Sequence, residues 1–195
     1  MTYWTHKGNI HAMTIPFSYI VFSALLCGLV IAVIADWRSS RKRARQDWRA
    51  LVAGLRPVDF AGVSAVATDY LDPHRSQTEL NPDEIWEFLG GYEGLKRMRD
   101  NAEIMLALAA YAQRWNYAEA VIVTERMRHD ATLLRSSVRR VQLGLLPFRL
   151  FRRFRFALPL HAQEASSCYY LMRQRLLSLY ETSHAGRFPK LAAVL

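Results

Sequence analysis

An uninterrupted apolar run near the N-terminus constrains this chain more than any other feature. Residues 15–35 read IPFSYIVFSALLCGLVIAVIA and hold no charged side chain. At about 1.5 Å of rise per residue, a helix of this length spans about 31 Å, close to the roughly 30 Å hydrocarbon core of a bilayer. Tyr19 and Trp37 stand near its two ends, where aromatic rings favour the membrane interface. The run predicts a transmembrane helix over residues 15–35.

Two other interpretations of this run compete with a retained anchor. A buried core helix rarely needs so long a stretch of wholly apolar residues. A cleaved signal peptide is a more serious alternative, because Val33-Ile34-Ala35 resembles a small-residue cleavage site. The mature chain would then open with residues 36–49, whose six basic side chains oppose translocation. A retained anchor therefore fits the sequence better.

The charges that flank the run predict its orientation. Lys7 is the one fixed positive charge on the N-terminal side, whereas the C-terminal flank carries Arg38, Arg41, Lys42, Arg43, Arg45 and Arg49. The positive-inside rule then places the N-terminus outside the inner (plasma) membrane and all that follows Asp36 in the cytoplasm. We expect a short extracytoplasmic N-terminus (1–14), the span (15–35), a basic juxtamembrane helix or linker (36–57) and a cytoplasmic α-helical domain (58–195).

Helix signals recur throughout the proposed cytoplasmic domain. Asn81-Pro82-Asp83-Glu84 combines an N-cap residue, a proline at the first helical position and acidic residues in the first turn, so a helix is expected to about Leu89, ending at Gly90-Gly91. Val58–Leu71 predicts a shorter helix before it. No stretch shows the alternating pattern that several strands would need.

Two long apolar seams predict an antiparallel αα-hairpin. A helix from about Tyr92 to Trp115 places on one face Leu95, Met98, Ala102, Met105, Ala109 and Ala112. Asn116 and Glu119 form a capping box for the next helix, whose seam comprises Ala120, Thr124, Met127, Ala131, Leu134, Val138 and Val141 and omits Asp130. A further helix, about His161–His184, is expected to bury Ala165, Cys168, Tyr169, Met172, Leu176 and Leu179. The predicted fold is all-α: one N-terminal transmembrane helix followed by a cytoplasmic helical bundle.

Residues with catalytic or metal-binding potential are few and isolated. Cys168 has no recognisable partner base and lies on an apolar helix face, so packing is the favoured interpretation. Glu125 and His129 share a helix face but form an ordinary hydrogen-bonding pair as readily as a metal site. We expect no catalytic, cofactor or metal site in this chain.

Basic charge is concentrated toward the C-terminus. The chain has 26 Lys and Arg against 17 Asp and Glu, a net charge of +9, and residues 131–195 hold eleven basic and two acidic side chains. Within them, residues 147–159 read PFRLFRRFRFALP. This segment, helical or extended, suits an anionic membrane surface, a single-stranded nucleic acid or a connector whose rings pack on the bundle.

The sequence predicts a non-enzymatic interaction or assembly subunit on the cytoplasmic membrane surface, with a protein partner or a second copy of itself. The alternative is a membrane-tethered regulator that binds nucleic acid or another polyanion through its basic C-terminal third. The residues expected to contact the leaflet are basic or aromatic: Arg38, Arg41, Lys42, Arg43, Arg45, Arg149, Phe151, Arg152, Arg153, Phe154 and Arg155.

Overall fold

The computed structural model of the chain describes residues 47–72, 80–145 and 158–195, together with 19, 22, 23, 26–28 and 30. The chain divides into two units, Met1–Lys42 and Arg43–Leu195. Every regular element among the described residues is helical, which confirms the all-α prediction. The helices are α2 (Trp48–Ala53), α3 (Phe60–Leu71), α4 (Pro82–Phe88), α5 (Gly91–Ala112), α6 (Tyr117–Leu145), α7 (Leu158–Ser183) and α8 (Phe188–Ala192).

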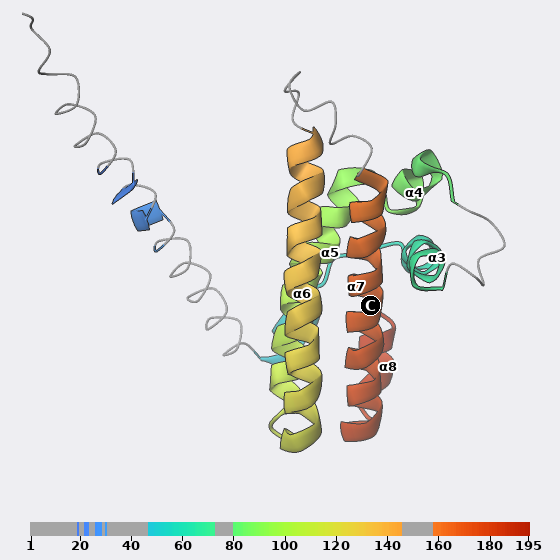
Figure 1. Ribbon diagram of the computed structural model, residues 1–195. Helices are drawn as coiled ribbons and strands as arrows, with labels where there is room; N and C mark the ends of the chain where they lie inside the picture. The colour runs from blue at the N-terminus through green and yellow to red at the C-terminus, as the bar shows by residue number, and fades with distance from the viewer. Residues whose placement is uncertain are drawn as a thin grey trace, which may run out of the picture. The chain divides into compact units, whose positions relative to one another are not determined.

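Three long helices, α5, α6 and α7, form the centre of the second unit (Figure 1). α5 and α6 run antiparallel and are joined by residues 113–116 alone, so the predicted αα-hairpin is confirmed. Asn116 caps α6 as expected: its Oδ1 accepts from the Glu119 N–H at 3.4 Å, and its Nδ2 donates to Glu119 Oε2 at 2.6 Å. α7 packs along both helices, and α3 lies against α7.

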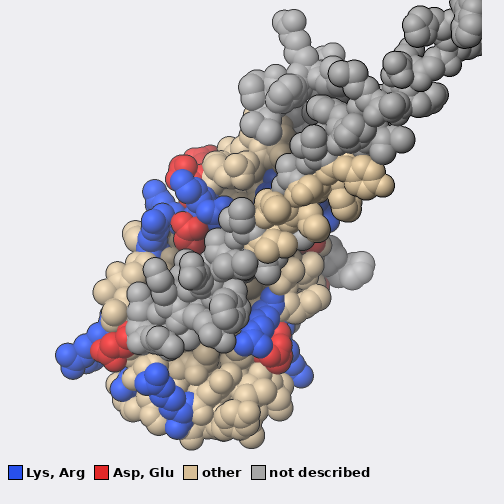
Figure 2. Space-filling model, turned by 90° about the vertical axis from the view of Figure 1, so that its left-hand side faces the viewer, with Lys and Arg blue, Asp and Glu red and all other residues tan. Residues whose placement is uncertain are grey.

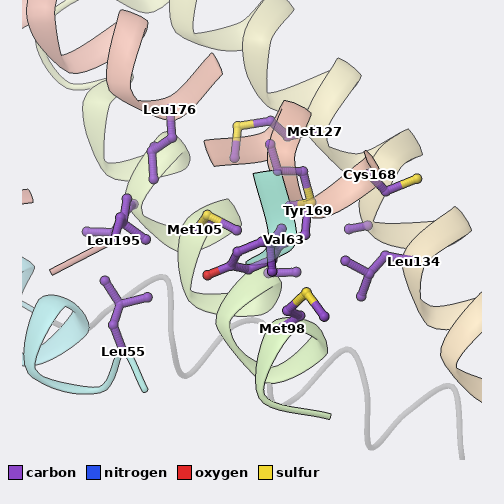
Figure 3. Packing of buried hydrophobic residues seen from close by; sticks show 14 of the residues in the cluster. Leu55, Val63, Met98, Met105, Met127, Leu134, Cys168, Tyr169, Leu176 and Leu195 are labelled. Atoms are coloured by element: carbon purple, nitrogen blue, oxygen red, sulfur yellow. The ribbon is translucent and has the colours of Figure 1, made fainter. Parts of the chain in front are cut away.

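The apolar seams meet in one core. Every residue predicted for the three seams is buried, including Leu95, Met98, Met127 and Leu134, each with no exposed surface. Figure 3 shows Val63 of α3 and Tyr169 of α7 among the methionines of α5 and α6. Burial on this scale stabilises the fold by about 25 cal/mol for each Å² of apolar surface withdrawn from water. The helical periodicity of the sequence was therefore a sound guide to the core.

The turn between α4 and α5 depends on its glycines. Gly90 and Gly91 have φ values of +66° and +64°, a left-handed conformation that side chains with a Cβ rarely adopt. Gly94 lies so close to the end of α4 that a Cβ there would stand 1.7 Å from the Leu89 carbonyl oxygen. The Gly-rich stretch is thus a helix connection, as its sequence predicted.

Several details differ from the sequence expectations. α7 begins at Leu158, before the expected His161, and α5 ends at Ala112 instead of Trp115. The short helix α8 was not predicted, because its five residues are too few to show a helical period. The placement of Asp130 outside the packed surface was wrong: it is 7% exposed, because α7 covers the flank of α6 beside the seam.

Residues 48–56 are part of the packed unit. Trp48, Leu51 and Leu55 are buried in the same core as the long helices. The helical domain therefore begins before residue 58, the start assigned from sequence, since α2 contacts α5 directly.

The predicted span over residues 15–35 lies largely outside the described residues. Those of its residues that are described are helical and exposed, among them Tyr19, Phe22 and Leu26. Within the part of the chain that the structure describes, no helix has both the length and the apolarity needed to cross a bilayer.

Candidate functional site

The residues predicted to contact the leaflet all fall outside the described part of the chain. Residues 31–46 hold Arg38, Arg41, Lys42, Arg43 and Arg45; residues 146–157 hold Arg149, Phe151, Arg152, Arg153, Phe154 and Arg155. The structure does fix the helix positions that border these segments. The first segment leads into Trp48 of α2, and the second joins Leu145 of α6 to Leu158 of α7.

An arginine enclosed by aromatic rings holds the start of α2 on the bundle. The guanidinium carbon of Arg187 lies 5.1 Å from the ring centroid of Trp48, 5.5 Å from that of Tyr111 and 4.7 Å from that of Trp115. A cation over an aromatic face is stabilised by about 0.5–2 kcal/mol, the larger values applying away from water. One side chain near the C-terminus therefore joins α2 to the end of α5.

The same aromatic cluster extends from the end of α5 to the residue that follows α7. The ring of Trp115 meets those of Tyr111 and His184 edge-to-face, at centroid separations of 5.1 and 4.9 Å. The guanidinium carbon of Arg114 lies 4.3 Å from the centroid of the Tyr111 ring. These contacts fix the orientation of Trp115 although 40% of its surface is exposed. The turn is thus packed against the end of α5 and against His184 and Arg187, which follow α7.

A buried asparagine fastens the other end of the α2 segment. Asn101 of α5 accepts from the Arg56 backbone N–H at 2.9 Å and donates to the Arg56 carbonyl at 2.8 Å and to the Tyr169 hydroxyl at 3.2 Å. Burial raises the pKa of Tyr169, so its phenol stays neutral at physiological pH. Residues 48–56 are therefore held at both ends by side chains distant in sequence, Arg187 at Trp48 and Asn101 at Arg56.

Buried polar contacts also connect α7 to its neighbours. Asp130 of α6 pairs with Arg175 of α7, and the Ser137 hydroxyl donates to Glu164 at 2.6 Å. The Tyr180 hydroxyl donates to the Leu108 carbonyl at 3.0 Å, and burial raises the pKa of Tyr180. These polar groups hold helices together.

Several arginines of the basic C-terminal third are engaged inside the bundle. Arg135 pairs with Glu103, Arg175 with Asp130, Arg173 lies over the Phe60 ring at 3.6 Å, and Arg187 occupies the aromatic cluster. Arg139, Arg140 and Lys190 are exposed. On the face drawn in Figure 2, basic and acidic side chains lie interspersed. The described part of this third therefore offers far less free positive charge than its composition suggests.

Cys168 has the properties of a packing residue. Its side chain is buried beside α6, and burial together with the nearby Glu164 raises the pKa of the thiol to about 11. At neutral pH it is protonated and therefore a poor nucleophile. Glu125 and His129 are both exposed, and Glu125 pairs with Arg128. Across residues 47–72, 80–145 and 158–195, no three potential metal ligands lie together.

Exposed apolar side chains gather at the hairpin-turn end, which we define as Trp115, Tyr117 and Ile122. Tyr117 is 72% and Ile122 is 58% exposed. These residues were not predicted as an exposed group. For Ile122 the helical spacing already indicates exposure, because it falls two positions after the buried Ala120 and so lies away from the seam. A second exposed set of three residues lies at the other end of the bundle, where α6 ends and α7 begins: Leu143, Leu145 and Leu160.

Comparisons with protein-family models, with curated proteins and with solved structures found no match to this chain.

Proposed function

We propose that this protein is a single-pass membrane protein whose helical bundle acts as a non-enzymatic interaction or assembly subunit on the cytoplasmic side of the inner (plasma) membrane. The observation that carries the proposal is the link between the apolar run and the bundle. The run over residues 15–35 is followed by five basic residues and then by Trp48, which is buried. The chain therefore passes from the predicted span into packed structure with little intervening sequence.

The length of this connection limits how far the bundle can lie from the membrane. Thirteen residues lead from Ala35 to Trp48. Even fully extended, they reach at most about 45 Å, and a helical path is shorter. A chain held this close to the leaflet suits a partner that is itself at the membrane.

The buried polar groups of the bundle are used in packing, which supports a function carried out by its surface. Asn101, Asp130 and Glu164 are each engaged in contacts between helices. The Cys168 thiol is protonated at neutral pH. The nucleic-acid alternative receives less support, because four arginines of the C-terminal third make contacts within the bundle.

The topology can be tested with the full chain in cells. A reporter active only in the cytoplasm, fused after Leu195, is expected to be active, and the chain is expected to resist alkaline carbonate extraction. Exchanging Arg38, Arg41, Lys42, Arg43, Arg45 and Arg49 for Gln, with three Lys added before residue 15, is expected to invert the reporter signal. A mature N-terminus at Asp36, or extraction by carbonate, would overturn the proposal.

The interaction role is tested separately. The full chain, purified in mild detergent, is expected to migrate as a stoichiometric complex with a protein partner or with itself. Duplex DNA binding whose affinity falls steeply with salt would favour the nucleic-acid regulator instead.

A further inference from the structure

The region of α3 and α4 carries only negative fixed charge, in a chain whose net charge is +9. Its described residues, 57–72 and 80–90, hold six acidic side chains and no Lys or Arg: Asp59, Asp69, Asp72, Asp83, Glu84 and Glu87. The two helices pack together, since a Cβ on Gly62 of α3 would stand 2.3 Å from the carbonyl oxygen of Phe88. Tyr70, Leu71 and Phe88 are exposed beside the carboxylates in sequence. We call this surface the acidic face.

The charge of the acidic face is not neutralised within the chain. Where the structure describes both partners, no ion pair joins any of its six carboxylates to Lys or Arg. Asp59 and Glu84 accept backbone hydrogen bonds at the starts of α3 and α4, and Asp69 accepts from Gln163. These partners carry no net charge, so the surface stays negative.

The outer side of α6 has the opposite charge. Opposite the seam, side chains three, four or seven positions apart form one exposed or half-buried row, which we call the α6 row: Ile122, Arg126, His129, Leu133, Arg140 and Leu143. In the described part of the chain, Arg126 and Arg140 pair with no carboxylate. The pKa of Arg175 is lowered by burial and by the positive charge of nearby Arg126. The neighbouring Glu125 is already paired with Arg128, so the α6 row keeps its positive charge.

α5 offers much less uncompensated positive charge than α6. Three ion pairs engage most of its charged side chains: Lys96 with Glu93, Arg99 with Asp100, and Glu103 with Arg135 of α6. Among the long helices, α6 is therefore the best match in charge to the acidic face.

The acidic face and the α6 row lie on opposite sides of the bundle. α3 and α4 pack on α7, and α6 packs on the other side of α7 (Figure 1). The two surfaces therefore cannot meet within one chain. Each also exposes apolar side chains among its charges, Phe88 and Leu71 on one and Ile122 and Leu143 on the other. Complementary charge around apolar contacts is the composition of a protein interface.

We propose that the acidic face of one copy of this chain binds the α6 row of a second copy, so that copies associate head to tail. Such a contact leaves one acidic face and one α6 row free in every pair, and it therefore continues into a ring or an open row. The inference rests on the proposed assembly role and names its partner as a second copy. It requires no particular placement of the bundle against the membrane.

Two charge-reversal variants of the full chain, purified in mild detergent, test the contact. The row variant combines Arg126→Glu with Arg140→Glu, and the face variant combines Asp72→Arg with Glu87→Arg. All four side chains are exposed or half-buried, and circular dichroism checks that both variants are folded. Arg97→Glu and Glu181→Arg, at exposed positions outside both surfaces, are the matched controls.

Sedimentation of the parent at low salt is expected to show particles larger than a dimer, whose mass grows with concentration and falls as salt is added. Each variant alone should need at least about tenfold more protein to associate. An equimolar mixture of the two should form a 1:1 dimer and nothing larger, because the intact face of one and the intact row of the other make a single contact. The two control variants should behave as the parent.

The other outcomes overturn the proposal. A parent that stays monomeric shows that the two surfaces do not bind each other. Association of either variant at the parental concentration shows that another surface, or the apolar run, holds the copies together. A mixture that remains monomeric, or control variants that also dissociate, would show that no specific pairing of these surfaces exists.

Failure of the proposed function is distinguishable from failure of this contact. A chain that carbonate extracts from membranes, but whose variants associate only when mixed, loses the membrane anchor and keeps the contact. A chain that resists extraction and forms a stoichiometric complex with a different protein, while both variants behave as the parent, keeps the proposed function and loses the head-to-tail contact.

Discussion

The two interfaces of α6 differ in the length of the chain that joins the helices, and both combine apolar packing with polar contacts. α6 meets α5 through Ala, Met, Leu and Val side chains of the two seams and through the Arg135–Glu103 ion pair. It meets α7 through further apolar packing, the buried Asp130–Arg175 pair and the Ser137–Glu164 hydrogen bond. Apolar burial has no direction, whereas ion pairs and hydrogen bonds require particular partners.

The connection between α5 and α6 is much shorter than the one between α6 and α7. Residues 113–116 join α5 to α6, so the chain itself fixes how those helices align. Residues 146–157 join α6 to α7, and twelve residues leave the alignment of α7 open. We expect the Asp130–Arg175 pair and the Ser137–Glu164 hydrogen bond to specify one register of α7 against α6. For α5 and α6 the short turn already limits the register, and the Arg135–Glu103 pair adds to a restraint that the chain provides.

The largest expected effect comes from the seam. Leu134→Asp removes a fully buried side chain and puts a carboxylate in its place, and we expect a loss of at least about 4 kcal/mol in the free energy of unfolding. Leu143→Asp, the same change at an exposed position of the same helix, is expected to cost within about 0.5 kcal/mol. Thermal unfolding of the full chain in detergent, followed by circular dichroism, measures both. Equal losses would contradict the assignment of the seam.

The second-largest effect is expected from removing the Asp130–Arg175 pair between α6 and α7. Asp130→Ala leaves the Arg175 guanidinium half-buried without its carboxylate, at an expected cost of about 2–4 kcal/mol. Glu125→Ala, which breaks an exposed pair with Arg128 on the same helix, is expected to cost less than about 1 kcal/mol.

The double variant Asp130→Leu, Arg175→Met separates stability from register. Replacing both charges by apolar groups is expected to recover the stability to within about 1 kcal/mol of the parent. If the pair specifies the alignment of α7, a spin-label distance distribution between α6 and α7 should broaden in this variant. An unchanged narrow distribution would show that packing alone sets the register.

The third effect is a pH dependence on the α7 side. The pKa of Cys168 is raised by burial from 9.0 to about 11 in the folded chain, so the folded state favours the protonated thiol. The contribution of Cys168 to the free energy of unfolding is therefore complete below pH 9. It is lost as the pH rises from 9 through 11, by up to about 2–3 kcal/mol. Cys168→Ala should remove most of the fall in the free energy of unfolding between pH 9 and 10. Tyr169 and Tyr180, whose pKa values are also raised, should preserve a decline above pH 10. If the free energy of unfolding falls equally with pH in parent and variant between pH 9 and 10, Cys168 is not the cause of the fall.

The smallest effect concerns a single hydrogen bond between α6 and α7. Ser137→Ala removes the donor to Glu164 and is expected to cost about 1–2 kcal/mol. Thr132→Ala is the matched control, because its hydroxyl donates to the Arg128 carbonyl within α6 and is exposed. Its cost should be near zero. Similar losses in the two variants would argue that the contact between helices adds nothing.

The features that the sequence predicted correctly are those that depend on short-range patterns. Helical spacing identified the seams, and cap residues such as Asn116 located the start of α6, because both signals act within a few residues. Asp130 was misjudged because the spacing of one helix does not reveal how many neighbours will cover it. The Trp48–Arg187 contact and the Asn101 hydrogen bonds were missed for a related reason. They join positions far apart in sequence, and no local pattern marks them.

The Trp48–Arg187 contact has a consequence in time. During synthesis Arg187 is added 139 residues after Trp48. At about 5–20 residues per second, on the order of ten seconds separate the two. Throughout that interval the newly made α2 lacks its contact with Arg187, and this contact forms only after residue 187 has been made. Docking of α2 is thus timed by the synthesis of residue 187, and a ribosome that stalls before it would leave the start of the bundle without this contact.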